Sequence, residues 1–462
     1  MKIAIVGAGI SGLTAAYYLN KQHDICVYES AQQIGGHTAT VDVEIDADKN
    51  TSATRQSFAV DTGFIVYNDW TYPNFIRLLD ELNVETQPTR MSFSVSNDTN
   101  GLEYAGSNLS TLFAQRRNIF SPTFWLMLKD IVRFNRESVE DLEQNRIAED
   151  MTLREYLSAN NYSQTFSDNY LVPMGAAIWS SGTDSMFDFP LLFFVRFFKN
   201  HGLLSIRNRP QWRVIKGGSR QYLAPLTSSF LHCIKTNTQI TAIERLEDKV
   251  WISTADGQHD EYDYLVMATH SDQALKLLVQ PSADESDILG AIPYQANDVV
   301  LHTDSALLPK KRRAWACWNY RLTEDKNSRG TADQANSSSS DMSRLTYNMN
   351  LLQGLDAPET FCVSLNQTSA IDPKKILRQF TYSHPVFTLP GMNAQARWSE
   401  IAGANRTWFC GAYWANGFHE DGVTSALRVV DSIAKYQQQT NQAATSRSDI
   451  GADKPIKHQA QA

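Results

Sequence analysis

Three glycines and one acid near the start of the sequence have the types and spacing of a phosphate-binding turn. Gly7, Gly9 and Gly12 stand in the pattern G-x-G-x-x-G, and Glu29 follows them. The first glycine permits a tight turn, the second leaves room for a pyrophosphate, and the third lets a helix pack closely on a strand. A carboxylate at Glu29 can accept hydrogen bonds from ribose hydroxyls. The pattern therefore predicts a dinucleotide site.

The segments around these residues are those needed to position them. Lys2 to Val6 is predicted to be a buried parallel strand, residues 13–20 a helix, and Ile25 to Tyr28 a second strand. A helix N-terminus offers unpaired N–H groups and the positive end of its dipole to phosphates. The alternative is a tight turn without a ligand, which gives no reason for an acid at the end of the second strand.

Length, charge and cysteine usage limit the class of protein. A chain of 462 residues exceeds what one core usually organises, so we expect two domains. The net charge of -8 gives no general attraction to nucleic acid, which we do not expect as a partner, or to anionic lipid. The five cysteines are far apart and form no C-x-x-C pair, so neither a metal site nor a disulfide framework is expected.

The same inspection yields expectations for location. The first strand starts at once, which leaves no room for a signal peptide, and no run of about eighteen apolar residues marks a membrane span. We expect a cytoplasmic protein without a transmembrane segment. Peripheral contact with the inner membrane stays open, as does the oligomeric state.

Further along, the pattern alternates between two kinds of structure. Strands that suit the first sheet are expected at residues 264–270 and 407–411, and the segment opened by Gly422 and Val423 is predicted to be a helix. Between them lie a predicted hairpin at 91–104, helices at 120–143 and from Thr152, and strands at 234–243 and 250–254. The Ser- and Asn-rich segment 324–341 is predicted to be a disordered loop.

These motifs occur in an order that resembles the flavin-dependent amine oxidase and phytoene desaturase superfamily. The opening V-G-A-G-I-S-G-L, Glu29, the pair Gly35-Gly36, the A-T-H strand end and the late E-D-G-V-x-S-A carry the resemblance. More narrowly, DTGFIVYN at 61–68 and GFHEDG at 417–422 resemble a bacterial branch of FAD-binding oxidoreductases often encoded beside cyclopropane-fatty-acid synthases.

The resemblance implies an α/β fold: a Rossmann-like FAD-binding domain with an inserted α+β substrate domain. We expect the FAD-binding domain to comprise three segments and the substrate domain two, followed by a disordered tail. The expected FAD-binding segments are 1–71, 210–270 and 398–436, the substrate segments 72–209 and 271–397, and the tail 437–462.

The resemblance also implies which residues hold FAD, which we expect to be bound non-covalently. They are Gly7, Ala8, Gly9, Ile10, Ser11 and Gly12 at the pyrophosphate, Glu29 at the adenosine ribose, Gly35, Gly36, His37 and Thr38 along the diphosphate and ribityl chain, Ile240 at adenine, Gly411 near the ribityl phosphate, and Gly422 and Val423 at the flavin pyrimidine. His37 departs from the arginine common in the superfamily, and Ala412 from the usual acid.

No residue is assigned to catalysis by the sequence alone. Candidates are His419, which could move a proton, and Tyr67 and Trp414, which could wall a pocket. Their alternatives are a capping residue for His419 and packed core aromatics for the other two. The aromatic stretch Phe187 to Phe198 suggests an acyl tunnel or a membrane contact, with a buried helix as the alternative.

The leading functional prediction is an FAD-dependent oxidoreductase. It would oxidise or desaturate an apolar substrate, with a fatty-acyl compound as one candidate, by hydride transfer to flavin. A true amine oxidase and an FAD-binding assembly protein without turnover remain as alternatives. A nicotinamide-dependent dehydrogenase is disfavoured, because the late E-D-G-V-x-S-A segment has no role in one.

Overall fold

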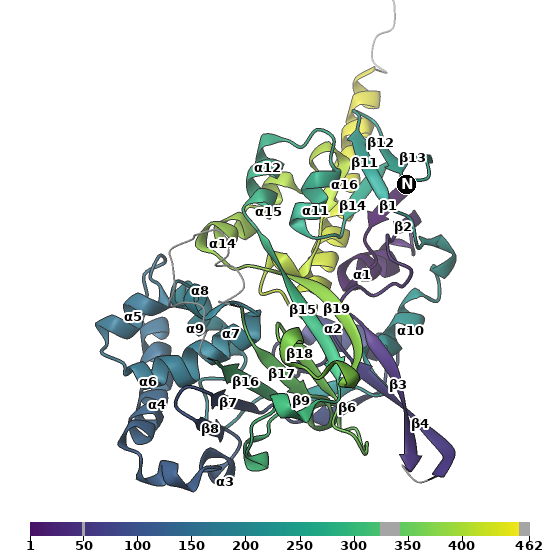
Figure 1. Cartoon of the computed structure of the whole chain (residues 1–462). Coiled ribbons are helices and arrows are strands. Elements are labelled where there is room, and N and C mark those ends of the chain that lie inside the picture. Colours follow the sequence, from purple (N-terminus) through teal and green to yellow (C-terminus); the bar gives the residue numbers. More distant parts are fainter. Residues whose placement is uncertain (49–50, 324–341, 452–462) are drawn as a thin grey trace, which may run out of the picture.

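The computed structural model describes residues 1–48, 51–323 and 342–451. Two bodies of secondary structure are visible, one around a parallel sheet and one around a larger, mainly antiparallel sheet (Figure 1). Long segments cross between them several times, so neither body is a continuous stretch of sequence. The chain is thus a mixed α/β protein, as predicted.

The parallel sheet has five strands in the order β10-β2-β1-β14-β20, with all neighbours parallel. Ile3, Ala4 and Ile5 are fully buried, which is why the first strand is a continuous apolar run. The expected strands at the start, centre and end of the chain therefore meet in one sheet. Their bounds are β1 (Lys2–Val6), β2 (Asp24–Tyr28), β10 (Ile234–Lys235), β14 (Tyr264–Met267) and β20 (Thr407–Phe409).

Helices and a small antiparallel sheet surround these strands. The small sheet has the order β11-β12-β13, and the strand expected at 234–243 is in fact two strands in two different sheets. The elements are α1 (Ile10–Leu19), α10 (Leu223–Thr227), α11 (Ser271–Leu277), α12 (Ala283–Gly290), α14 (Leu389–Ala396), α15 (Trp398–Ile401), α16 (His419–Gly451), β11 (Ile240–Arg245), β12 (Val250–Thr254) and β13 (His259–Tyr262).

The second body is built on a seven-stranded sheet in the order β19-β15-β18-β17-β16-β7-β8. Its strand pairs are antiparallel except β16 with β7, and the predicted hairpin at 91–104 is confirmed as β7 and β8. The strands are β7 (Phe93–Asn97), β8 (Leu102–Ala105), β15 (Tyr294–His302), β16 (Trp318–Leu322), β17 (Leu345–Asn348), β18 (Cys362–Leu365) and β19 (Ile376–Pro385).

Two smaller sheets complete the strands. A long hairpin projects from the body, and a short three-stranded sheet lies near its base (Figure 1). The tip of the hairpin, at residues 49–50, falls outside the described residues. The hairpin is β3 (Thr40–Asp48) with β4 (Thr51–Asp61), and the short sheet is β5 (Tyr67–Asn68), β9 (Trp212–Ile215) and β6 (Thr86–Thr89).

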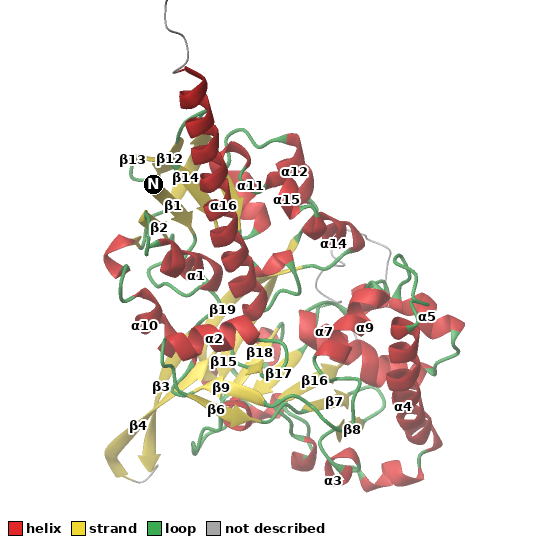
Figure 2. Ribbon diagram, turned by 180° about the vertical axis from the view of Figure 1, so that it is seen from behind, coloured by secondary structure: helices red, strands yellow, loops and turns green. Residues whose placement is uncertain are grey.

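A group of helices packs beside β7, β8 and β16, as seen from behind in Figure 2. The predicted helix at 120–143 is confirmed, and so is the capping box of Thr152 with Glu155. The helices of this second body are α3 (Leu109–Leu112), α4 (Pro122–Glu143), α5 (Leu153–Ala159), α6 (Gln164–Phe166), α7 (Val172–Trp179), α8 (Thr183–Phe187), α9 (Leu191–Asn200) and α13 (Met349–Gln353), while α2 (Pro73–Glu81) packs against α16.

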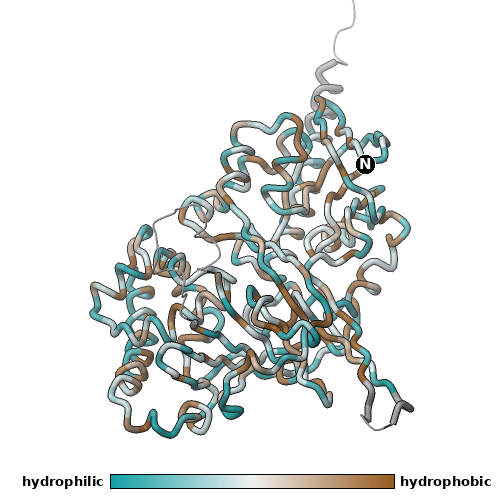
Figure 3. The backbone as a smooth tube through the Cα atoms, viewed as in Figure 1, coloured by the Kyte–Doolittle hydropathy of each residue, from teal (hydrophilic) through white to brown (hydrophobic). Residues whose placement is uncertain are grey.

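The aromatic stretch Phe187 to Phe198 lies mainly on α9, and its buried-helix interpretation is confirmed. Phe194, Phe197 and Phe198 are buried in the second core, against Trp179. In the hydropathy view of the backbone, several central segments are coloured hydrophobic, while many outer loops are coloured hydrophilic (Figure 3). The stretch therefore presents no free apolar face.

Two boundary predictions at the C-terminus are wrong. The last helix begins at His419 rather than at Gly422, because the Gly422 N–H is already bonded to the Phe418 carbonyl oxygen at 3.1 Å. The same helix continues to Gly451, so residues 437–451 are helical instead of a disordered tail. The loop predicted at 324–341 lies outside the described residues. The division into domain segments stays a prediction.

Gly422 has a packing role that its place in the sequence did not reveal. It lies where α16 crosses α1, and a Cβ added there would stand 2.9 Å from both Ile10 Cγ2 and Ser11 Oγ. Contacts this short are repulsive, so only glycine lets the two helices approach this closely. The first turn of α1 is therefore held in place from behind by α16.

Replacing Gly422 by leucine should force α16 away from α1. Overpacking of this kind costs about 1–3 kcal/mol, and we expect a lower melting temperature together with a lower flavin content of the purified protein. Ala434→Leu, on the exposed side of the same helix, is the matched control. Unchanged melting temperature and flavin content in Gly422→Leu would contradict the packing argument.

Candidate cofactor and substrate site

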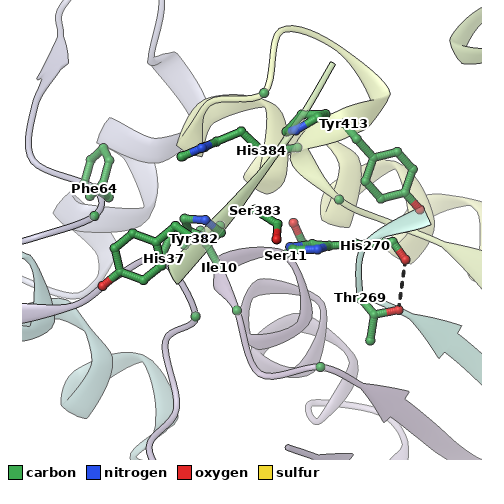
Figure 4. Close-up of a pocket in the computed structure, with 18 of the residues that line it drawn as sticks. Ile10, Ser11, His37, Phe64, Thr269, His270, Tyr382, Ser383, His384 and Tyr413 are labelled. Carbon is green, nitrogen blue, oxygen red and sulfur yellow. Dashed lines mark hydrogen bonds between the residues drawn. The ribbon is translucent and has the colours of Figure 1, made fainter. Parts of the chain in front are cut away.

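One cavity of about 900 Å³ reaches from the parallel sheet to the seven-stranded sheet. Its walls include the turn after β1, the start of α16, strand β19 and the end of α7. Figure 4 shows side chains from several of these elements converging on it. Residues that are far apart in sequence thus form a single site.

The phosphate end of this cavity is bare backbone. Gly7, Ala8, Gly9, Ile10 and Ser11, which the resemblance assigns to the pyrophosphate, line it together with Gly35 and Gly36. A Cβ added at Gly9 would meet no protein atom within 4 Å, so the open space beside it belongs to the cavity. The first N–H groups of α1 have no partner within that helix and suit a diphosphate.

The third glycine of the motif has a different task. Gly12 does not line the cavity, and a Cβ there would lie 1.9 Å from the carbonyl oxygen of Gly7. Gly7 itself has φ of +105°, in the region that favours glycine. Both residues therefore fix the turn, whereas Gly9 leaves the space that a ligand needs.

The acid expected at the ribose lies at the neighbouring edge. Glu29 lines the cavity and accepts hydrogen bonds from the N–H groups of Ala8 and Ala31, both at 2.9 Å. These two bonds hold the carboxylate in place beside the glycine turn. Ile240 lines the same region with Thr238 and Gln239, where the resemblance places adenine.

The remaining predicted cofactor residues divide into two groups. Gly411 and His37 line the cavity, and so does Ala412. Thr38 and Val423 are buried and do not line it, and neither does Gly422. Thr38 instead bonds through its hydroxyl to Tyr222 and to His419 Nε2, so its contribution is to hold the wall of the cavity.

Four histidines line the centre of the cavity: His37, His270, His384 and His419. Burial lowers the pKa of His37 to about 3 and that of His384 to about 4, and it also lowers those of His270 and His419. The imidazole rings of His37 and His384 lie 5.5 Å apart, which disfavours charging both. All four rings are therefore neutral at pH 7 in this structure.

The neighbours of His384 decide which of its ring nitrogens carries the proton. The backbone N–H of Asp298 donates to Asn366 Oδ1 at 3.0 Å, so the amide nitrogen of Asn366 is the group that donates to Asn297 Oδ1. The amide nitrogen of buried Asn297 then donates to His384 Nδ1, also at 3.0 Å. A neutral His384 must carry its proton on Nε2, which leaves one N–H donor for a ligand.

The predicted catalytic candidates are placed differently from one another. His419 lines the cavity and stacks on Phe64 with ring centroids 3.5 Å apart, and its Nε2 already has Thr38 and Tyr222 as partners. Tyr67 and Trp414 are buried and do not line the cavity. For these two, packing in the core is the interpretation that the contacts favour.

The acids after His419 hold helices together. Glu420 accepts hydrogen bonds from the N–H groups of Asn74 and Phe75 and so caps α2. Asp421 accepts one from the Phe418 N–H at 2.9 Å, at the start of its own helix. Burial raises the pKa of Asp421 to about 7.

Several residues of the cavity were not found from the sequence. His270 is the last residue of the strand predicted at 264–270, so its place at the carboxyl end of a parallel strand was a usable signal. Tyr382 and His384 on β19 and Trp318 on β16 had no such signal, because their sheet assembles from distant segments. Of the described residues that line the cavity, the charged ones are Glu29 and Lys276.

The arrangement fits FAD. Open space at Gly9, unpaired N–H groups at the start of α1 and an oriented carboxylate at Glu29 match the pyrophosphate and ribose of its adenosine half. The neutral histidines and aromatic rings beyond them form a wall suited to an uncharged ring system.

Within the described ranges, none of the helices has the length and apolar character of a membrane span.

The two glycines should separate binding from folding. Gly9→Val places its side chain in open space, so the variant should keep its melting temperature and lose most bound FAD. Gly12→Val collides with the Gly7 carbonyl group, so that variant should lose stability as well. Flavin absorbance after gel filtration, read beside the thermal unfolding curve, tests both. Full FAD occupancy in Gly9→Val would refute this placement of the pyrophosphate.

Asn297→Asp should reverse the tautomer of His384. A carboxylate at this position can only accept from Nδ1–H, and its charge favours the imidazolium, so the pKa of His384 should rise from about 4. Histidine NMR titration of the full chain measures the shift. Gln295→Glu adds the same charge opposite His384 without that hydrogen bond and serves as the control. An equal rise of the His384 pKa in both variants would show that the added charge alone causes it, and would contradict the hydrogen-bond argument.

The sequence matches a known protein family, and the fold resembles several solved structures. The family model described as flavin containing amine oxidoreductase matches residues 10–434. A CLA-producing fatty acid isomerase from P. acnes has a TM-score of 0.62 at 15% identity, covering 94% of this chain and 98% of that one. Putrescine oxidase bound to putrescine has a TM-score of 0.63 at 14% identity, covering 94% and 99%.

A third similar structure is cyclohexylamine oxidase from Brevibacterium oxydans IH-35A, with a TM-score of 0.63 at 15% identity over 95% of this chain and 99% of that one. At such identities the likenesses show a shared fold. The superfamily resemblance found in the sequence is confirmed by the family model, and the narrower bacterial branch stays a prediction. Because the match extends over nearly the whole chain, the protein belongs to the family of flavin-containing amine oxidoreductases.

Proposed function

We propose that this enzyme binds FAD non-covalently and removes hydride from an apolar, fatty-acyl-like substrate, oxidising or desaturating it. The observation that carries the proposal is the uncharged, apolar end of the cavity. Its walls are aliphatic and aromatic side chains from both sides of the second core: Val299, Leu352, Leu365, Trp318, Tyr347, Ile178, Trp179, Phe387 and Phe418.

The charges around the cavity favour this substrate class over an amine cation. Among the described residues that line it, the single carboxylate is Glu29, at the end assigned to ribose. A buried ammonium group without a counter-ion loses its hydration uncompensated, which is strongly unfavourable. An acyl chain needs only apolar surface, which this end supplies.

The amine alternative lacks a feature associated with amine oxidases of the superfamily, a lysine that holds a water near the flavin. Lys276 is the lysine among the described lining residues, and it lies on α11 beside Gln273 and Leu277. Its side chain is 78% exposed. Such an exposed lysine is better placed to lie at the entrance of the cavity than to hold a water beside the flavin ring.

The structural neighbours are compatible with the proposal without deciding it. One of them is a fatty acid isomerase and two are amine oxidases, all with similar TM-scores. The first supports the idea that this fold can accept a fatty acid. Because the family consists of oxidoreductases, turnover is favoured over a role as an assembly protein.

The chemistry divides between cofactor and protein. When bound, FAD supplies a two-electron acceptor for hydride. Desaturation would remove one substrate hydrogen as hydride, for which FAD would be the acceptor, and the hydrogen on the neighbouring carbon as a proton, which would pass to water. The chain's own residues would seat the acyl chain at Trp318 and Leu352, exclude water, and offer the Nε2–H of His384 as a donor.

Non-covalent binding is supported by the cysteines. None of the five is among the described residues that line the cavity, and Cys362 and Cys410 are fully buried in the cores. We also propose a cytoplasmic location with peripheral contact to the membrane, because a fatty-acyl substrate partitions into lipid.

Anaerobic reduction tests the substrate class. Fatty-acyl compounds should bleach the flavin absorbance of the purified protein, and putrescine or cyclohexylamine should leave it unchanged. Narrowing the apolar end by Leu352→Phe should disfavour longer chains. Loss of room for two methylenes costs about 1.6 kcal/mol, roughly a tenfold rise in the apparent dissociation constant.

Leu351→Phe is the matched control, since Leu351 precedes Leu352 on α13 and its side chain is exposed. It should bind chains of every length as the unaltered protein does. Reduction by amines but not by acyl compounds would overturn the proposed substrate class.

A further inference from the structure

The end of the molecule that carries α3 and α4 has an exposed surface that the proposed site does not use. Six exposed large hydrophobic side chains fall within residues 109–132, including Leu109, Phe120 and Trp125. Phe120 is 86% exposed and Leu109 73%. Exposed apolar side chains gathered in this way mark a surface that another body covers.

These side chains share a small area. The indole N–H of Trp125 donates to the Ile119 carbonyl oxygen at 2.8 Å, and its ring lies 5.6 Å from that of Phe113. On α4, Trp125, Lys129 and Val132 are spaced three and four residues apart, so they lie on one exposed face. The surface is therefore held by secondary structure rather than by a loose tail.

A run of four basic residues lies beside it. Residues 310–313 read Lys-Lys-Arg-Arg, all exposed, and the short helical turn Arg312–Ala314 contacts α3. Buried Glu103 fixes it by accepting the backbone N–H groups of Lys310 and Lys311, both at 2.9 Å.

The positive charges here are not neutralised by neighbours. Arg116, Arg117 and Lys129 add to the basic run, and none of these seven side chains forms an ion pair with a described residue. The nearby acids have other partners among the described residues: Glu103 accepts only the backbone N–H groups of the basic run, Asp98 pairs with Arg321, and buried Asp130 accepts from Ser163 and pairs with Arg133. A chain with a net charge of -8 thus concentrates cations around its most exposed aromatic side chains.

We propose that this patch docks the enzyme on an anionic phospholipid surface. We call it the docking patch, and it consists of Leu109, Ile119, Phe120, Trp125 and Leu126 with Arg116, Arg117, Lys129, Lys310, Lys311, Arg312 and Arg313. Basic side chains attract acidic head groups, and aromatic and aliphatic side chains enter the interface between head groups and acyl chains. A protein partner or a nucleic acid would be a poorer explanation for a patch that combines these positive charges with side chains as exposed as Phe120.

The inference goes beyond the proposed activity, and it rests on a different surface. It names the part of the chain that would make the peripheral contact. Vesicle binding requires no turnover, and flavin reduction by a soluble substrate requires no vesicle. Failure of one is therefore measured separately from failure of the other.

Co-sedimentation of the full chain with vesicles tests the docking patch. Phosphatidylcholine vesicles that contain phosphatidylglycerol should bind the protein, pure phosphatidylcholine vesicles should bind it weakly, and high salt should release it. Two double variants, Leu109→Ser with Phe120→Ser and Lys310→Glu with Arg313→Glu, should each weaken binding about tenfold or more. All four side chains are exposed, so folding should be unaffected.

Matched controls come from exposed residues elsewhere. Leu231→Ser with Leu246→Ser, and Lys374→Glu with Lys435→Glu, make two changes of the same kind away from the docking patch and should bind vesicles as the unaltered chain does. Equal binding to both vesicle types, or unchanged binding by the two double variants, would overturn the proposal. The proposal would also be overturned if the unaltered chain formed a dimer and bound no vesicles, and if Leu109→Ser with Phe120→Ser dissociated that dimer.

Discussion

Close backbone packing around the first turn of α1 is the constraint on which the rest of the site depends. Gly12 lies against the Gly7 carbonyl group on one side, and Gly422 lets α16 press on Ile10 and Ser11 from the other. With the turn fixed between a sheet and a second helix, Gly9 can leave open space without loss of order. The phosphate end of the cavity is therefore rigid although it has almost no side chains.

Beyond that turn, most of the residues that line the cavity are uncharged. Its histidines are kept neutral by burial, and the chain from Asp298 through Asn366 and Asn297 gives His384 one defined tautomer. A neutral donor with a fixed direction can orient a ligand without attracting anions in general. The same low polarity at the far end of the cavity supports the proposal of an apolar substrate, because a buried cation without a counter-ion is unfavourable.

Charge and exposed apolar surface are instead placed on the outside, where α3 and α4 end the second body. The net charge of an acidic chain opposes contact with an anionic membrane, so a local basic area is needed both to attract the membrane and to set the orientation of the chain on it. A cavity with few charged residues and a basic, apolar patch on the outside are the combination expected of the proposed enzyme, whose substrate would reside in lipid.

The sequence by itself determined the parallel sheet, the glycine turn and Glu29, because these depend on local runs and fixed spacing. It misplaced the start of the last helix at Gly422, since a glycine that serves helix crossing resembles one that opens a helix. Only the tertiary structure brought together His37, His270 and His384, set Asn297 beside His384, and placed residues 310–313 next to α3. Those neighbours come from sheet pairing and packing between distant segments, which no local pattern encodes.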